Sequence, residues 1–271
     1  GIVFQTAEIY GGLSGFFDYG PVGVELKNNI KQHWWKRFVK KRNDVVGIDA
    51  AIIMNPEVWK ASGHVEAFTD PLVECKICHL RFRADKQEEL MVHEKEHNVR
   101  HSGESRQMTG RIQNQILNQV QDDKGDSGQA RMTGVKAGSE GIWTEPKKFN
   151  LLMEAKLGVI EDGKQSTFLR GEITQGAFVN FRNIVNSSRV KIPFGIAQIG
   201  KAFRNEITPG NFTYRSREFE QMELEFFIKS NDKEGNEWFD YWKKQRMEWY
   251  LSLCMKQENL RFRKHEDNER A

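Results

Sequence analysis

The sequence predicts an α+β protein with an antiparallel β-sheet flanked by helices and a small polar subdomain inserted between the parts of the core. Two strand-like segments within residues 194–228 are joined by a short polar loop containing Gly and Pro, which is typical of an antiparallel hairpin. Apolar residues recur every fourth position from 22 to 38, as on one face of a helix. The short connection of the hairpin argues against a doubly wound parallel sheet. The sequence also has no glycine-rich phosphate loop of the P-loop or dinucleotide type.

The first predicted helix begins at Gly20-Pro21 and runs to about residue 42. Its apolar stripe fits either core packing or a contact between subunits, and periodicity alone does not separate the two; the stripe is Val22, Leu26, Ile30, Trp34 and Phe38. A short helix is expected after Asn55-Pro56. Longer helices are predicted at 84–100, at 174–187 with Phe178, Phe181 and Val185 inward, and at 234–256.

Further strands are predicted at 44–54, 148–158 and 166–170. Residues 101–140 are rich in Gln, Asn, Asp, Ser and Gly with few apolar anchors, so an insertion or mobile segment is expected there. The predicted organisation is a first part of the core at 1–74, an insertion at 75–142 and a second part of the core at 143–271.

Bulk composition limits the classes of protein that fit. A chain of 271 residues with 38% hydrophobic and 29% charged content suits a globular protein with a sizeable core. A net charge of +3 gives no global basic field, and no apolar run reaches the length of a membrane span. Three cysteines and no visible signal peptide favour a reducing, cytoplasmic location. The chain starts at Gly1 rather than Met, and we expect both ends to be cut from a longer protein.

The predicted hairpin has one apolar and one polar face, because strand side chains alternate. Met222, Leu224 and Phe226 fall on the apolar face, and the opposite face carries Phe219, Gln221, Glu223 and Glu225. In the connection, Arg204 and Arg215 are suited to holding phosphates, since a guanidinium fork matches phosphate oxygens, and Phe219 could stack on a base. The alternative is a solvated face with salt bridges.

Cys75 and Cys78 are followed by His93 and His97, which would lie one helical turn apart and share a face. Two thiolates and two imidazoles complete a tetrahedral zinc set. Phe82 and Leu90 could form a small core beside it. The alternative is a pair of surface thiols and two solvated histidines.

The hairpin resembles motif 2 of class II aminoacyl-tRNA synthetases through Phe203-Arg204-Asn205-Glu206, a loop, and then Arg215, Phe219 and Glu223. Further stretches resemble the dimeric bacterial type of glycyl-tRNA synthetase. These are EIYGGLSGFFDYGPVGVELKNNIKQHWW at 8–35, DAAIIMNPEVWKASGH at 49–64, RFRADK at 81–86 and PFGIAQIGKAFRNEITPGNF at 193–212.

The resemblance implies a ligase that uses ATP and Mg²⁺ to activate glycine as an adenylate and transfers it to tRNA(Gly). It also implies a cytoplasmic homodimer formed through the motif 1 helix. Arg204 and Glu206 would be the catalytic pair. The residues implied for ATP are Arg204, Asn205, Glu206, Tyr214, Arg215, Ser216, Arg217, Glu218 and Phe219. Those implied for glycine are Arg83, Glu172, Phe219, Glu220, Gln221, Met222 and Glu223.

The chain departs from the family pattern in ways that matter for function. The family's R-P-E-T-A-Q-G stands here as Arg170-Gly171-Glu172-Ile173-Thr174-Gln175-Gly176, and loss of the proline is expected to loosen the backbone that aims Glu172. A second Cys pair, the third motif and the anticodon-binding domain are also missing from this chain. These departures favour an alternative, a non-catalytic synthetase-like module that binds RNA or zinc.

Overall fold

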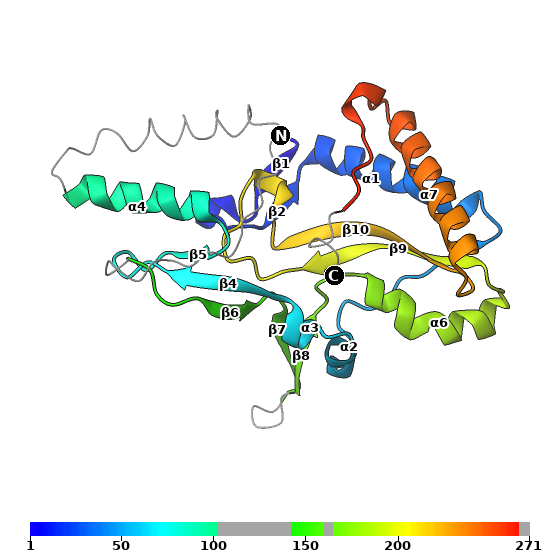
Figure 1. Cartoon of the computed structure of the whole chain (residues 1–271), viewed down its shortest axis with the longest axis horizontal. Helices are drawn as coiled ribbons and strands as arrows, with labels where there is room; N and C mark the ends of the chain where they lie inside the picture. The colour runs from blue at the N-terminus through cyan, green and yellow to red at the C-terminus, as the bar shows by residue number, and fades with distance from the viewer. Residues whose placement is uncertain (102–141, 160–164, 266–271) are drawn as a thin grey trace. The chain divides into compact units, whose positions relative to one another are not determined.

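The computed structural model describes residues 1–101, 142–159 and 165–265 (Figure 1). The chain divides into two compact units, one made of Gly1–Phe68 with Leu151–Ala271 and the other of Thr69–Asn150. The insertion predicted at 75–142 falls within the second unit. The polar segment predicted at 101–140 lies outside the described residues except for His101. Among the described helices, none is both long enough and apolar enough to cross a membrane.

The central sheet of the first unit has the strand order β10-β9-β3. Strands β9 (Phe194–Phe203) and β10 (Glu218–Phe227) are antiparallel along their whole length, from Phe203 opposite Glu218 to Phe194 opposite Phe227. The predicted hairpin is therefore confirmed. The short strand β3 (Val45–Gly47) joins β9 in parallel, which makes the sheet mixed.

Helices cover both faces of this sheet (Figure 1). On one face lie α1 (Pro21–Trp35), the π-helical turn Lys36–Lys40 that continues it, and α7 (Asp232–Ser252). The buried cluster beneath them is Trp34, Phe38, Val45, Ala197 and Trp249. Helix α6 (Thr174–Ser188) packs on the other face, where its Phe181, Ile184 and Val185 contact a cluster that contains Phe194 and Ile196.

Smaller elements complete the two units. The first unit also contains the strand pair β1 (Val3–Gln5) and β2 (Phe17–Tyr19), the pair β7 (Met153–Leu157) and β8 (Gln165–Leu169), and the short helices α2 (Pro56–Ala61) and α3 (His64–Ala67). The second unit contains a sheet of order β5-β4-β6, formed by Arg81–Arg83, Thr69–Glu74 and Lys147–Asn150, and the helix α4 (Gln87–His101).

The strand predicted at 44–54 is wrong in length, because only Val45–Gly47 pairs as a strand. Side chains take over the backbone hydrogen bonds just beyond it. The Ala50 N–H donates to the Gln198 amide oxygen at 3.4 Å, and the Ala50 carbonyl accepts from the Arg170 guanidinium at 2.7 Å. The Ala50 backbone is thus satisfied by side chains, so regular pairing ends there, and Ile53 forms only an isolated bridge with Leu169 of β8.

Burial and pairing correct two other predictions, for Phe178 and for residues 148–158, and they divide the apolar stripe of the first helix. Phe178, predicted to point inward, is 48% exposed at the rim of the α6 cluster. The strand predicted at 148–158 breaks where the Leu151 N–H turns to the Phe68 carbonyl at 2.9 Å, and β6 and β7 lie on either side of this break. The apolar stripe of α1 is divided, because Val22 and Leu26 are exposed whereas Trp34 and Phe38 are buried.

This division predicts different costs for truncation along one helix. Trp34 is 1% exposed in the core cluster, so Trp34→Ala should lower the free energy of unfolding by about 3–5 kcal/mol. Leu26→Ala, at a position 54% exposed on the same helix, should change it by less than about 0.5 kcal/mol. Denaturant unfolding of both variants measures this, and equal losses would contradict the packing described.

Candidate functional site

The candidate site lies on the polar face of the β9–β10 hairpin. In the pairing of the two strands, Gln198 of β9 lies directly opposite Glu223 of β10. Because side chains alternate along a strand, Phe219, Gln221 and Glu225 lie on the same face as Glu223. The structure confirms this predicted face. Gln198 is 2% exposed, so this amide is part of the buried framework of the site rather than of its surface.

The segment 170–176 runs beside this face, and hydrogen bonds fix it along its length. The Arg170 guanidinium donates to the Lys201 and Ala50 carbonyls at 2.6 and 2.7 Å. The Gly171 carbonyl accepts from Arg204 Nε at 3.1 Å. The segment that loss of the proline is expected to loosen is therefore held at Arg170 and at Gly171.

The second half of the segment is tied directly to the hairpin. The Ile173 N–H donates to the Gln221 side-chain oxygen at 3.2 Å, and the Ile173 carbonyl accepts from the Gln198 amide. Ile173 is fully buried, and the next residue, Thr174, donates its hydroxyl hydrogen to a carboxylate oxygen of Glu223. These contacts fix Glu172, which lies between Gly171 and Ile173.

The carboxylate of Glu172 has its own partners. His64 Nε2 lies 3.2 Å from Glu172 Oε1, and the Gln175 amide donates to the same oxygen at 3.0 Å. On the other side of its ring, His64 Nδ1 lies 2.8 Å from the Ser62 hydroxyl oxygen. A carboxylate next to Nε2 requires a hydrogen there, so the imidazole donates to Glu172.

Glu172, Glu223 and Glu225 form an acidic cluster. Burial raises the pKa of Glu223, the hydrogen bond from Thr174 opposes this rise, and the neighbouring Glu172 adds to it. Burial likewise raises the pKa of Glu225, and repulsion from Glu223 and Glu172 adds to the effect. A cluster whose charges repel one another in a partly dry site is stabilised by an incoming cation. An ammonium group fits this requirement.

Arg204 lies between two aromatic rings. Its guanidinium carbon is 5.2 Å from the centroid of Phe68 and 5.2 Å from that of Phe219. Such contacts attract a cation to the ring faces and keep its planar fork in one orientation. The arginine and the acidic cluster are therefore brought together by the same strand pair and the same 170–176 segment.

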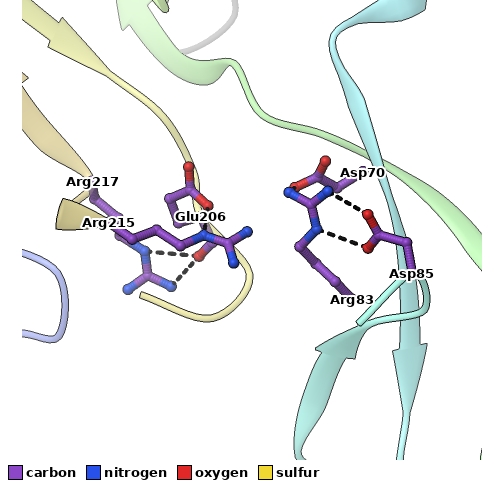
Figure 2. A network of polar contacts seen from close by, with 6 residues as sticks. All are labelled: Asp70, Arg83, Asp85, Glu206, Arg215 and Arg217. Carbon is purple, nitrogen blue, oxygen red and sulfur yellow. Dashed lines mark hydrogen bonds and ion pairs between the residues drawn. The ribbon is translucent and has the colours of Figure 1, made fainter. Parts of the chain in front are cut away.

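Figure 2 shows Arg215 and Arg217 turned toward Glu206, which is 9% exposed. Arg215 Nε lies 2.7 Å from Glu206 Oε2, and Arg217 donates from Nε and Nη2 to the Glu206 carbonyl at 3.1 and 2.8 Å. Two predicted ATP-binding arginines thus meet the predicted catalytic glutamate.

The remaining predicted ATP-binding residues of the loop differ in exposure. Ser216 is 6% exposed and its hydroxyl donates to the Glu218 carbonyl at 3.0 Å, whereas Tyr214 is 95% exposed. Asn205 donates its N–H to the Leu151 carbonyl at 2.7 Å. Ser216 and Asn205 are thus tied to the backbone, while the ring of Tyr214 is left in solvent.

Three of the predicted residues lie on the opposite face of β10, away from the acidic cluster. Glu218 pairs with Lys201, and Glu220 pairs with Lys27 and Lys31 at 2.9 and 3.0 Å. Met222 packs on the apolar cluster under α1 and α7. Neighbours in a strand point to opposite faces, so Glu220 and Met222 cannot share a pocket with Gln221 and Glu223.

Arg83, predicted to contact glycine, lies in the second unit. It pairs with Asp70 at 2.7 Å and with Asp85 at 2.6 Å (Figure 2). The hydrogen bond from Arg83 lowers the pKa of Asp85. Within its own unit, the guanidinium therefore joins β4 to the turn after β5.

The second unit also brings Cys75, Cys78, His93 and His97 together, with all four potential ligand atoms within 4.8 Å of one another. Cys78 Sγ lies 3.3 Å from His93 Nε2, Cys75 Sγ lies 3.5 Å from His97 Nε2, and the two Nε2 atoms are 3.0 Å apart. Around a tetrahedral zinc ion, sulfur and nitrogen ligands stand about 3.6 Å apart and two nitrogens about 3.3 Å apart.

The surroundings of this cluster also suit a metal. Cys75 is fully buried, and His93 and His97 are 7% and 5% exposed. The Phe82 ring packs on His93 with centroids 4.6 Å apart, and Leu90 is buried, as predicted for a small core. The four ligand residues and their spacing therefore fit a zinc ion. The alternative, that they are surface thiols and solvated histidines, is not supported.

Glu225, Thr174 and His64 are not among the residues implied for ATP or glycine, although Glu225 is predicted on the polar face and His64 ends the matching stretch 49–64. Alternation already places Glu225 two residues beyond Glu223 on the same face, and that signal could have added it. Thr174 and His64 come from segments far from the hairpin in sequence. Only the tertiary structure brings them to the two carboxylates.

Comparison with known proteins confirms the resemblance. The chain is 51% identical over 269 residues to a glycine–tRNA ligase of Caldanaerobacter subterraneus subsp. tengcongensis, covering 99% of this chain and 55% of that protein. It is 50% identical to that of Acetivibrio thermocellus and 46% identical to that of Thermobifida fusca, over 99% and 98% of this chain and 54% and 51% of those proteins. The chain therefore spans about half the length of the curated relatives that it matches.

Other comparisons add little. No family model matches the chain. A solved structure, the RNA-binding domain of threonyl-tRNA synthetase from Cryptosporidium parvum Iowa II, is 16% identical with a TM-score of 0.42 and covers 84% of this chain and 34% of that one. That likeness is too low to support an argument about the fold.

The acidic cluster predicts a pH-dependent effect of removing one charge. The pKa of Glu225 is raised above its ordinary 4.5 in the folded protein, so its favourable contribution is present at low pH and is lost as pH rises through the raised value. Glu225→Gln should therefore gain stability relative to the native protein between pH 4 and pH 7.5, by less than about 1 kcal/mol because the group is partly exposed.

Denaturant unfolding at both pH values measures this difference. Glu258→Gln is the matched control, since the Glu258 side chain is 73% exposed outside the cluster. A Glu225→Gln variant whose relative stability is the same at pH 4 and pH 7.5 would contradict the electrostatic account.

Proposed function

We propose that the protein carrying this chain is a class II glycine–tRNA ligase, which activates glycine with ATP as glycyl-adenylate and transfers it to tRNA(Gly). One observation supports this above the others. In a chain about 50% identical to glycine–tRNA ligases, the acidic cluster and a stacked arginine lie on one face of the hairpin. The first suits an ammonium group and the second a phosphate.

Activation of a carboxylate on the α-phosphate of ATP needs alignment and positive charge more than covalent help from the protein. Arg204, held by Phe68, Phe219 and the Gly171 carbonyl, would meet the α-phosphate. Phe219 would also stack on adenine, with Glu206 on the adenine side and Arg215 at the γ-phosphate. Mg²⁺, when bound with ATP, would neutralise phosphate charge.

Glycine offers an ammonium and a carboxylate but no side chain. Glu172 and Glu223 would receive its ammonium, with Gln221 beside them. A pocket that merely tolerates a methyl group discriminates by roughly 1–3 kcal/mol, so alanine has to be refused by crowding. Thr174 already bonds to one oxygen of Glu223, and Gln175 bonds to one oxygen of Glu172. These contacts support a pocket with little spare room.

The same proposal includes a cytoplasmic protein that forms a homodimer. It also includes a loop that binds tRNA. The exposed part of the α1 stripe, Val22 and Leu26, supports a subunit contact through this helix. The polar loop 207–214, followed by Arg215 and Arg217, supports an approach of the acceptor end there, because RNA ends are commonly bound by stacking and arginine contacts.

We also propose that Cys75, Cys78, His93 and His97 hold a structural zinc ion. The fit of the four ligand atoms to a tetrahedral site supports this, as does their burial. Four protein ligands leave no open position, so the role proposed is to stabilise the second unit.

A non-catalytic synthetase-like module that binds RNA or zinc remains the alternative from another class of protein. It predicts affinity for tRNA without ATP-dependent chemistry. The altered 170–176 segment favoured it, but the hydrogen bonds along that segment remove this reason. Arg204 and Phe219, which a module without ATP chemistry would not need, are both retained.

Glycine-dependent exchange of pyrophosphate into ATP tests the proposal. The assay should use this chain and a version extended past Ala271. Exchange is expected in the extended protein, and Arg204→Ala should lower its rate by about 10²–10³-fold because a charge aimed at the reacting phosphate is lost. Arg182→Ala removes an exposed arginine of α6 and should leave the rate unchanged. A folded, extended protein without exchange would favour the non-catalytic alternative.

Metal analysis tests the zinc site. The purified protein should contain one zinc per chain, and Cys75→Ser should remove most of it and lower the unfolding temperature of the second unit. Cys254→Ser changes an exposed thiol outside the cluster and should leave zinc content unchanged. Equal zinc content in both variants would contradict the assignment.

A further inference from the structure

Five side chains form a continuous series of ring and cation–π contacts in the first unit, here called the aromatic column: Trp59, His64, Phe68, Arg204 and Phe219. The Trp59 and His64 ring centroids are 5.3 Å apart, and those of His64 and Phe68 are 5.2 Å apart. The Arg204 guanidinium then follows, 5.2 Å from Phe68 and 5.2 Å from Phe219. The column begins at a fully buried tryptophan of α2.

Both halves of the candidate site depend on this column. His64 is the residue that meets the Glu172 carboxylate, and Arg204 is the residue proposed for the α-phosphate. Phe68 is the one member that contacts both His64 and Arg204. Its ring also borders Gly171, where an added Cβ would stand 2.9 Å from Phe68 Cε1.

Phe68 is itself fixed at its backbone. Its N–H donates to the His64 carbonyl at 3.2 Å, and its carbonyl accepts from the Leu151 N–H at 2.9 Å. The ring therefore presents a fixed face to the guanidinium, which has a long and otherwise flexible stem. Without that face, Arg204 would keep the hydrogen bond from Nε to the Gly171 carbonyl and one ring contact, to Phe219, which is also the proposed platform for adenine.

We propose that Phe68 is a positioning residue that holds the Arg204 guanidinium at the angle needed for the α-phosphate and couples it to the His64–Glu172 contact. This inference rests on the proposed function and assigns a role to a residue that touches neither glycine nor ATP. The flat π-face is what matters. A leucine fills similar space but gives the cation no quadrupole to lie against.

The test compares Phe68→Leu, Phe68→Tyr and a matched Phe181→Leu in the extended protein. Phe181 is also half-buried in the first unit, but it packs on Phe194 and Phe227, away from the column. Glycine-dependent ATP–pyrophosphate exchange is measured with ATP varied. Phe68→Leu should lower kcat/KM for ATP by about tenfold, with most of the loss in kcat. Phe68→Tyr should stay within about twofold of the native rate.

Phe181→Leu should lower the unfolding temperature but leave kcat/KM within about twofold of native, which separates positioning from general packing. A second readout is independent of activity. In protein labelled with ¹⁵N-arginine, the Arg204 Nε–H signal should be shifted upfield by the two ring currents. Phe68→Leu should reduce that shift and Phe68→Tyr should keep it.

The results of these experiments separate a failure of the Phe68 inference from a failure of the proposed function. Native-like kinetics and an unchanged Arg204 signal in Phe68→Leu would overturn the inference, and so would equal losses in Phe68→Tyr and Phe68→Leu. A native protein that gives no exchange would overturn the proposed function and, with it, the catalytic role of Phe68. A native protein with exchange and a tolerant Phe68→Leu would overturn only the role of Phe68.

Discussion

The site depends on one buried cation, the guanidinium of Arg170, which is 2% exposed. It donates to carbonyl groups of two separate segments, at Lys201 in β9 and at Ala50 after β3. Burial lowers the pKa of Arg170, opposed by the charges of Asp49 and Glu223. A charge buried in this way is costly unless its donors are satisfied, so the surrounding backbone is held where those donors reach. Gly200 leaves the necessary room, since a Cβ there would stand 2.2 Å from Arg170 Nη2.

The remainder of the site follows from this anchor. Once the backbone at Arg170 is fixed, the next residues bond to the hairpin in turn, with Thr174 bonded to the Glu223 carboxylate and Gln175 to that of Glu172. Three carboxylates close together destabilise the protein when they are all ionised, and a bound cation, such as the proposed ammonium, would relieve that cost. Electrostatic repulsion of this kind is common at sites that have to bind a ligand in preference to water.

The sequence pattern was sufficient to predict those features of the fold and the site that depend on local sequence alone. Alternation along 218–228 identified the polar face of the hairpin, and the Cys and His spacing identified four residues that do converge. The same alternation argues against Glu220 and Met222 as glycine-binding residues, because adjacent strand residues cannot share a face with Gln221 and Glu223. The length of β3 was not predictable, because long-range side chains, Gln198 and Arg170, replace its partners.

Tertiary contacts determine the parts of the site that the sequence pattern could not predict. His64 and Thr174 meet Glu172 and Glu223 through segments more than forty residues apart in the chain. No local pattern marks Thr174, and His64 is marked only by its place in the stretch 49–64 that carries the resemblance. Likewise, the replacement of proline by Gly171 predicts a loosened segment, but hydrogen bonds at Arg170, Gly171 and Ile173 restrain it. Local propensity was overridden by hydrogen bonds made across the fold.

The central claim is that one pocket holds the ammonium of glycine on the acidic cluster and the phosphate on Arg204. The most direct measurement is a crystal structure of the extended protein with a non-hydrolysable glycyl-adenylate analogue. The account predicts the analogue's ammonium within hydrogen-bond distance of Glu172 and Glu223, its phosphate substitute on the Arg204 guanidinium and its adenine on Phe219. An analogue bound elsewhere, or an ammonium that leaves both carboxylates untouched, would contradict it.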